Sequence, residues 1–164
     1  MNQVIYIMGV SGCGKSTIGK MLSDATGYPF FDGDDFHTKV NLEKMRLGHP
    51  LDDEDRLGWL MAIHDFAEVQ QKQHSIILAC SALKEKYREI LSASMENFTR
   101  WVYLKGDYNF ISERLTQRKG HFMPASLLQS QFDALEEPVN ALVIEINKTA
   151  EEMVMEIRKK ISLY

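Results

Sequence analysis

A glycine-rich turn between an expected strand and an expected helix constrains this chain more than any other feature. It reads Gly9-Val-Ser-Gly-Cys-Gly14-Lys15-Ser16-Thr17, a complete match to G-x-x-x-x-G-K-[ST]. Glycines let the backbone turn so that successive N–H groups point at phosphate oxygens, and the next helix adds its positive end. The lysine of such a loop reaches the outer phosphates and the serine hydroxyl is placed for Mg²⁺. The spacing predicts a nucleotide site formed by Gly9, Val10, Ser11, Gly12, Cys13, Gly14, Lys15, Ser16 and Thr17.

Short apolar runs alternate with amphipathic stretches along the chain. Strands are expected at Val4–Met8, Tyr28–Phe31, Ile76–Ala79, Trp101–Leu104 and Ala141–Ile146. Helices are expected at Lys15–Ala25, Asp53–Gln73, Lys84–Ala93, Tyr108–Gln117, Ser126–Ala134 and from a Thr149–Glu152 capping box onward. This alternation predicts an α/β fold with a parallel sheet between helices. Ligands of such sheets bind outside the carboxyl ends of the strands.

The size and charge of the chain exclude several classes of protein. Its 164 residues fit a single domain, residues 1–164, and 45% of them are hydrophobic. Lys and Arg total 19 against 23 Asp and Glu, a net charge of −4. Proteins that bind nucleic acid or a membrane surface generally need a basic face, so neither is an expected partner. The sequence shows neither a cationic leader nor a membrane-length apolar run.

The two cysteines, Cys13 and Cys80, are too few for a disulfide framework or a metal knuckle. Together with the lack of a leader, this favours a cytoplasmic enzyme. Cys13 admits two interpretations: an oxidation-sensitive thiol in an anion-binding loop, or a small side chain that the loop tolerates. The second is favoured.

An acidic turn follows the second expected strand and reads Asp32-Gly-Asp34-Asp35-Phe-His37. On an extended segment, carboxylates two residues apart point to the same side. We expect Asp32 to hold Mg²⁺ beside Ser16, because the third strand ends without the acid that often fills this role. We expect Asp34 to take the proton of an acceptor hydroxyl. The alternative is a turn that simply favours Asp and Gly, and His37 is either a substrate contact or a polar loop residue.

Segments along most of the chain resemble the gluconate kinases. The similarity covers about residues 4–146 and extends from the two turns to Gly48-His-Pro-Leu-Asp-Asp-Glu-Asp55-Arg56, Trp59-Leu60, Cys80-Ser81-Ala82-Leu83-Lys84, Tyr87-Arg88, Arg118-Lys-Gly-His121-Phe122 and Gln131-Phe132. The resemblance implies a P-loop NTPase fold of the nucleoside-monophosphate-kinase type, with three layers, a five-stranded parallel sheet and a helical lid. It also implies ATP and Mg²⁺ as cofactors, D-gluconate as substrate, 6-phospho-D-gluconate as product, a role in gluconate catabolism and a homodimer.

A carboxylate substrate needs cations that are not committed to ATP. Lys84 and Arg88 stand four residues apart, so on a helix they would share a face at the carboxyl edge of the sheet. Arginine can grip a carboxylate with two hydrogen bonds. With the resemblance, we expect Lys84 and Arg88 to contact substrate; the alternative is a solvated helix surface. Arg56 either contacts substrate or fixes the acidic run before it.

A basic segment resembles the lid of small kinases, expected at about residues 114–130 with Gly120 as a hinge. We expect Arg118 to stabilise the transferring phosphoryl group of ATP and His121 to contact substrate. Arg114, also expected at ATP, either supports Arg118 or lies against the adenine. Lys15, Asp34 and Arg118 form the expected catalytic set. The alternative for the segment is a basic, exposed helix end.

Two other functions are alternatives to gluconate phosphorylation. A kinase for another small hydroxy acid such as shikimate, or for a nucleoside, is disfavoured by the segments at Pro50–Trp59 and Lys119–Phe122. A guanine-nucleotide switch would have N-K-x-D after a late strand, but Asn147-Lys148-Thr149 is followed by Ala150. The switch is therefore the weaker alternative.

Overall fold

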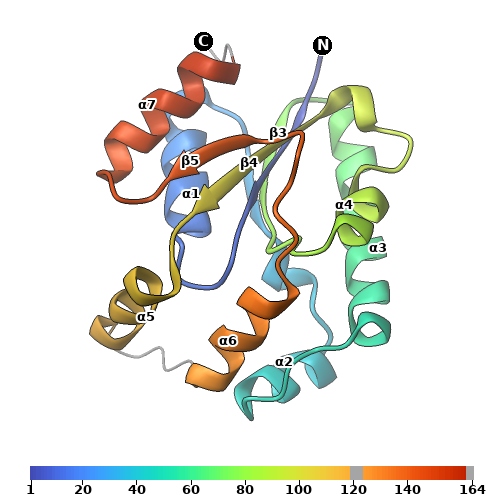
Figure 1. The fold of residues 1–164 in the computed structure, drawn as a ribbon. Coiled ribbons are helices and arrows are strands. Elements are labelled where there is room, and N and C mark those ends of the chain that lie inside the picture. The colour runs from blue at the N-terminus through green and yellow to red at the C-terminus, as the bar shows by residue number, and fades with distance from the viewer. Residues whose placement is uncertain (119–123, 162–164) are drawn as a thin grey trace.

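Five parallel strands form the centre of the protein in a computed structural model that describes residues 1–118 and 124–161. The strands are β1 (Val4–Met8), β2 (Phe30–Asp32), β3 (Ile76–Ala79), β4 (Thr99–Lys105) and β5 (Leu142–Glu145). Their order in the sheet is β2-β3-β1-β4-β5, and every neighbouring pair is parallel. The predicted five-stranded parallel sheet is confirmed (Figure 1).

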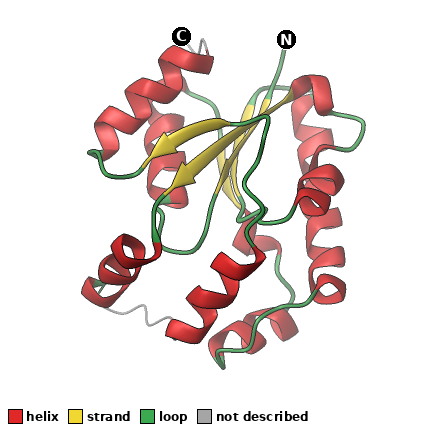
Figure 2. Ribbon diagram, viewed as in Figure 1, coloured by secondary structure: helices red, strands yellow, loops and turns green. Residues whose placement is uncertain are grey.

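Helices cover both faces of this sheet, as Figure 2 shows. One face carries α1 (Lys15–Thr26) and α7 (Ala150–Ile161), and the other carries α3 (Asp53–Gln71) and α4 (Glu85–Ser92). Three further helices lie beyond the carboxyl ends of the strands: α2 (Lys39–Arg46), α5 (Tyr108–Gln117) and α6 (Ala125–Ala134). Short 3-10 helices, η1 (Gly33–Phe36) and η2 (Glu96–Phe98), precede α2 and β4. The predicted three layers are therefore present.

Alternation along β1 explains the two packed layers. Ile5 and Ile7 belong to the core cluster under α1 and α7, while Val4, Tyr6 and Met8 belong to the cluster under α3 and α4. All five side chains are fully buried. Successive side chains of a strand point to opposite faces, so an uninterrupted apolar run requires cover on both.

The structure adds one helix that the sequence pattern did not predict. Helix α2 buries only Asn41, so it lacks the apolar periodicity by which helices are found. Its start is defined locally, because Thr38 Oγ1 accepts a hydrogen bond of 3.2 Å from the Asn41 N–H. The Asn41 side chain then donates to the Asp55 carbonyl at 2.8 Å and ties α2 to α3.

The remaining elements follow the predicted order, with bounds that shift by a few residues. Strand β2 starts at Phe30 instead of Tyr28, and α4 starts at Glu85 instead of Lys84. The capping box before α7 is confirmed by reciprocal hydrogen bonds between Thr149 and Glu152. Within the two described stretches, no helix has the length and apolarity that crossing a membrane requires.

Candidate active site

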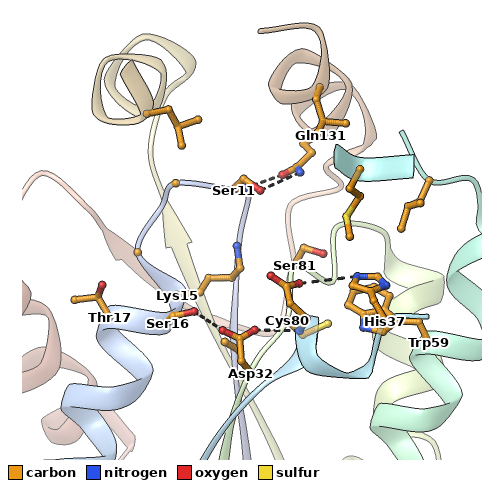
Figure 3. A pocket seen from close by; sticks show the side chains of 18 of the residues that line it. Ser11, Lys15, Ser16, Thr17, Asp32, His37, Trp59, Cys80, Ser81 and Gln131 are labelled. Carbon is orange, nitrogen blue, oxygen red and sulfur yellow. Dashed lines mark hydrogen bonds and ion pairs between the residues drawn. The ribbon is translucent and has the colours of Figure 1, made fainter. Parts of the chain in front are cut away.

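A pocket of about 530 Å³ lies at the carboxyl ends of the strands, where the sheet topology places ligands. Figure 3 shows the phosphate-binding turn on one side of it and the acidic turn with α3 on the other. Its polar lining residues are Ser11, Lys15, Ser16, Thr17, Lys20, Asp32, Asp34, His37, Arg56, Ser81, Arg118, Ser130 and Gln131. Its other lining residues are Gly12, Gly14, Met45, Leu51, Trp59, Ala79, Cys80, Leu115, Pro124 and Leu127.

The glycine-rich turn has the conformation that its sequence predicts. Gly12 and Gly14 adopt φ values of +82° and +101°, which side chains rarely allow. Helix α1 starts at Lys15, so the N–H groups of its first turn face the pocket with the positive end of the helix. Lys15 Nζ donates to the carbonyls of Gly9 and Val10, both at 3.0 Å, which holds the ammonium inside the loop. The turn can therefore surround phosphate groups.

Ser16 and Asp32 come together from two different strand ends. Ser16 Oγ donates to Asp32 Oδ2 at 2.6 Å, and Asp32 Oδ1 accepts from the Asp34 N–H at 3.0 Å. A hydroxyl and a carboxylate beside a phosphate-binding turn suit Mg²⁺, because this ion prefers oxygen ligands. Its remaining ligands are usually water molecules and phosphate oxygens. No cluster of three or more His, Cys, Asp or Glu residues that could hold a metal occurs in the described chain. Such a magnesium site would depend on the nucleotide.

The expectation that Asp32 and Asp34 share an extended segment is wrong. Strand β2 ends at Asp32, and Asp34 lies in η1, because the Asp32 carboxylate caps that short helix. Both carboxylates nevertheless line the pocket. The Asp34 side chain is open to solvent inside the pocket, but protein atoms of the pocket walls surround it. Its pKa is raised because the pocket walls take away part of its hydration and Asp32 repels its charge, while Lys15 opposes this shift.

His37 lies in the pocket wall, and its side chain is only 3% exposed. Its Nε2 is 3.9 Å from Asp34 Oδ1, and its ring stacks on Trp59 with centroids 4.0 Å apart. Burial, with the nearby charge of Arg56, lowers the pKa of His37 to about 4. The imidazole is therefore neutral near pH 7.

Arg56 also lines the pocket, as the first of its two interpretations requires. Its Nε donates to the Leu51 carbonyl at 3.2 Å, and its guanidinium lies 5.4 Å from the centre of the Tyr87 ring. A guanidinium supported in this way can hold a carboxylate in the pocket with its other N–H groups.

Lys84 and Arg88 do not share a helix face, so the prediction of a common face is wrong. Lys84 is the residue before α4, with extended backbone, and its ammonium pairs with Asp53 at 3.3 Å. Arg88 is 3% exposed and donates to the Ala82 carbonyl at 2.8 Å and to the Glu136 carbonyl at 3.0 Å. Neither residue is among the described lining of the pocket. Arg88 instead satisfies carbonyl groups of two connecting segments.

Only one of the two arginines predicted to act from the lid segment lies at the pocket. Arg118 ends α5 and lines the pocket, whereas Arg114 lies over the Phe110 ring at 5.8 Å, outside the described lining. His121 and Gly120 lie outside the described residues.

The predicted nucleotide-binding residues 9–17 do not all belong to the described lining of the pocket. Thr17 lines the pocket, while Gly9, Val10 and Cys13 lie behind the described lining. Cys13 is fully buried in the core, in agreement with a small packing residue. Cys80 lines the floor of the pocket. Burial raises the pKa of its thiol to about 12, so the thiol is uncharged near pH 7.

Sequence reasoning gave no site role to several residues that line the pocket, among them Lys20, Trp59, Ser81, Ser130 and Gln131. Two of these residues, Trp59 and Gln131, make hydrogen bonds that shape the pocket. The Trp59 indole N–H donates to the Gly33 carbonyl at 2.7 Å, and Gln131 Oε1 accepts from the Ser11 N–H at 2.7 Å. Both contacts join distant segments, so the only available signal was their place in the resembling segments.

The chain is similar to one family model and to several known proteins. A family model described as Shikimate kinase matches residues 11–162. A probable gluconokinase of Rattus norvegicus is 46% identical over 154 residues, which are 82% of this chain and 83% of the relative. The thermoresistant gluconokinase of Escherichia coli (strain K12) is 39% identical over 167 residues, with 97% and 95% covered.

Solved structures give the same fold. A crystal structure of a gluconokinase from Sinorhizobium meliloti 1021 superposes with a TM-score of 0.90 at 39% identity, covering 98% of this chain and 91% of that one. A shikimate kinase from Aquifex aeolicus superposes with a TM-score of 0.68 at 19% identity, covering 98% and 96%, and supports the fold alone. The predicted P-loop kinase fold is confirmed.

Proposed function

We propose that this chain, which belongs to the gluconokinase family, transfers the terminal phosphoryl group of ATP to D-gluconate and forms 6-phospho-D-gluconate. The observation that carries this proposal is the shared pocket. The phosphate-binding turn with Lys15 and Ser16 and the acceptor-type residues Asp34, His37 and Arg56 line one cavity of about 530 Å³.

The nucleotide occupies the side of the pocket formed by the start of α1. Backbone N–H groups of residues 12–16 and the Lys15 ammonium surround the phosphates, where their charge stabilises the transition state. Ser16 and Asp32 hold Mg²⁺, which when bound neutralises charge on the phosphate oxygens. The 2.6 Å contact between their oxygens supports this pairing.

The acceptor occupies the opposite side. Arg56 holds the gluconate carboxylate, and neutral His37 exchanges hydrogen bonds with the hydroxyls. Asp34 orients the reacting hydroxyl and takes its proton. The raised pKa of the Asp34 carboxyl supports this role, because a base works best when its pKa lies nearer the working pH.

Arg118 acts from the end of α5, on a segment that we propose closes over the site as a lid. Its place in the pocket lining supports an interaction with the transferring phosphoryl group. His121 is proposed as an acceptor contact on the same segment. Closure of this segment would also exclude water and so limit ATP hydrolysis.

A coupled ADP-release assay across sugar acids, shikimate and nucleosides tests the assignment. Gluconate is expected to support turnover with a clear preference over shikimate. Shikimate is included because the matching family model is described as Shikimate kinase. ATP hydrolysis that does not depend on gluconate, with no acceptor preferred, would contradict the assignment. Omitting Mg²⁺ is expected to abolish turnover.

We also propose that two copies of the chain form a homodimer. Support comes from the outer face of α3, where Leu57, Met61 and Val69 are about half exposed at helical spacing, with Asp65 between the last two. Apolar side chains gathered on an exposed helix face are typical of subunit contacts. Light scattering of the purified protein measures its mass, and a monomer at all concentrations would contradict the proposal.

A further inference from the structure

Trp59 reaches the active site from the buried side of α3. It is 2% exposed, yet it belongs to the pocket lining. Figure 3 shows its ring directly behind His37, at the side of the pocket opposite Lys15. Trp59 therefore connects the hydrophobic core to the acceptor side of the site.

The first contact of Trp59 fixes the acidic turn. Its indole N–H donates to the carbonyl of Gly33, the residue between Asp32 and Asp34, at 2.7 Å. On its other side Gly33 lies close to the end of β3, since a Cβ atom at this position would be only 2.5 Å from the Ala79 carbonyl oxygen. The peptide that carries both carboxylates is thus held between Trp59 on one side and β3 on the other.

The second contact of Trp59 fixes the imidazole. The rings of Trp59 and His37 are nearly parallel, 15° apart, with centroids separated by 4.0 Å. His37 Nδ1 is buried and has no hydrogen-bond partner within the described part of the chain, so hydrogen bonding at that atom does not set the ring plane. The stack with Trp59 sets the plane of the imidazole instead, and it leaves His37 Nε2 3.9 Å from Asp34 Oδ1.

We propose that Trp59 is a positioning residue that aligns the Asp34 carboxylate and the His37 imidazole with each other for one acceptor hydroxyl group. Its indole N–H places the first through Gly33, and its ring places the second. A displacement of about 1 Å between such groups can cost about a hundredfold in rate, which is ample reason for a rigid support. The acceptor chemistry rests on the proposed function, whereas the two contacts do not.

Trp59→Phe separates the two contacts, because phenylalanine keeps a ring for stacking and removes the N–H donor. We expect kcat to fall about 10- to 100-fold, while the KM for ATP stays within about twofold. Trp59→Leu removes the stack as well and is expected to raise the KM for the acceptor. Trp101→Phe is the matched control, because Trp101 stacks on Tyr6 outside the described lining, and it should keep wild-type kinetics.

A double-mutant cycle distinguishes positioning from general stability. If Trp59 acts partly through His37, then Trp59→Leu and His37→Asn should be less than additive in their effects on the acceptor KM. Thermal melting and MgADP titration show that each variant is folded and binds nucleotide. A folded Trp59→Phe protein with unchanged kcat would overturn the proposal, and so would full additivity in the cycle.

Fluorescence provides a measurement that does not need turnover. Trp59 and Trp101 are the two tryptophans, so Trp101→Phe leaves Trp59 as the only indole. Adding gluconate with MgADP is expected to change its emission. If another acid changes it and gluconate does not, the gluconate assignment fails while the role of Trp59 stands. If every acceptor that the enzyme turns over leaves the emission unchanged, the role of Trp59 is overturned.

Discussion

Ser11 and Gln131 form two hydrogen bonds across 120 residues of sequence. The Ser11 N–H donates to Gln131 Oε1 at 2.7 Å, and Gln131 Nε2 donates to Ser11 Oγ at 3.1 Å. The apex of the phosphate-binding turn is therefore attached to α6, the helix in which the proposed lid segment ends. Figure 3 shows this pair spanning the top of the pocket.

Gln131→Ala is expected to weaken MgADP binding about 3- to 10-fold. The substitution removes two hydrogen bonds that hold the turn, each contributing about 0.5–1.5 kcal/mol. Isothermal titration with MgADP measures the change. Gln129→Ala is the control, because Gln129 lies on the same helix and its side chain bonds only to Asp133 among the described residues. Equal nucleotide affinity in both variants would contradict this coupling.

Asp34→Asn is expected to reduce kcat about 10²- to 10⁴-fold, the range typical of a lost general base. Nucleotide affinity should change little, because Ser16 and Asp32 keep their mutual contact. Single-turnover phosphoryl transfer and MgADP titration measure the two quantities separately. Asp35→Asn, at the exposed neighbouring carboxylate, should keep most of the activity. A near-wild-type rate for Asp34→Asn would remove Asp34 from the proton-transfer step.

Substitution by methionine should affect substrate binding at Arg56 and protein stability at Arg88. Arg56→Met is expected to raise the acceptor KM about 10- to 100-fold with little change in stability, because a charge-assisted hydrogen bond to the substrate is lost. Arg88→Met is expected to lower the free energy of unfolding by about 2–4 kcal/mol, because the buried Ala82 carbonyl and the part-buried Glu136 carbonyl lose their donor. Steady-state kinetics and urea unfolding measure the pair. A raised acceptor KM in a stable Arg88→Met protein would restore Arg88 to the substrate site.

The site was predictable where its chemistry is local in sequence. The phosphate-binding turn and Ser16 follow from one motif, because glycine spacing and the start of a helix are properties of adjacent residues. Asp32 followed from its position at a strand end. The common face predicted for Lys84 and Arg88 is wrong because a spacing of four residues describes one face only inside a helix, and Lys84 precedes α4. Arg88 also donates to the carbonyl of Ala82, a residue with a φ of 45° that no sequence pattern indicated.

The contacts that sequence could not provide are those between distant segments. Trp59 has the apolar helix spacing of a core residue, and it is one; its indole N–H meets Gly33 only because α3 packs against η1. Gln131 stands in an ordinary amphipathic helix, and the Ser11 contact requires the fold to bring α6 onto the turn. Neither partner can be deduced from periodicity, which reports which side of a helix is buried but not what lies there.

His37 should make the protein less stable as the pH falls from about 6.5 to about 4. Its pKa is about 4 in the folded protein against 6.5 as the ordinary value, because burial and the Arg56 charge oppose protonation. In this interval the unfolded chain binds more protons than the folded one, so the free energy of unfolding decreases by up to about 1.4 kcal/mol per pH unit.

The wild-type protein should therefore lose about 2 kcal/mol more than His37→Gln between pH 7 and pH 5, since glutamine has no proton to gain there. Urea unfolding followed by circular dichroism at the two pH values measures the difference. His49→Gln serves as the matched control at an exposed position, and it should keep the wild-type pH dependence. Parallel stability curves for wild type and His37→Gln would show that the buried imidazole is not held neutral by its surroundings.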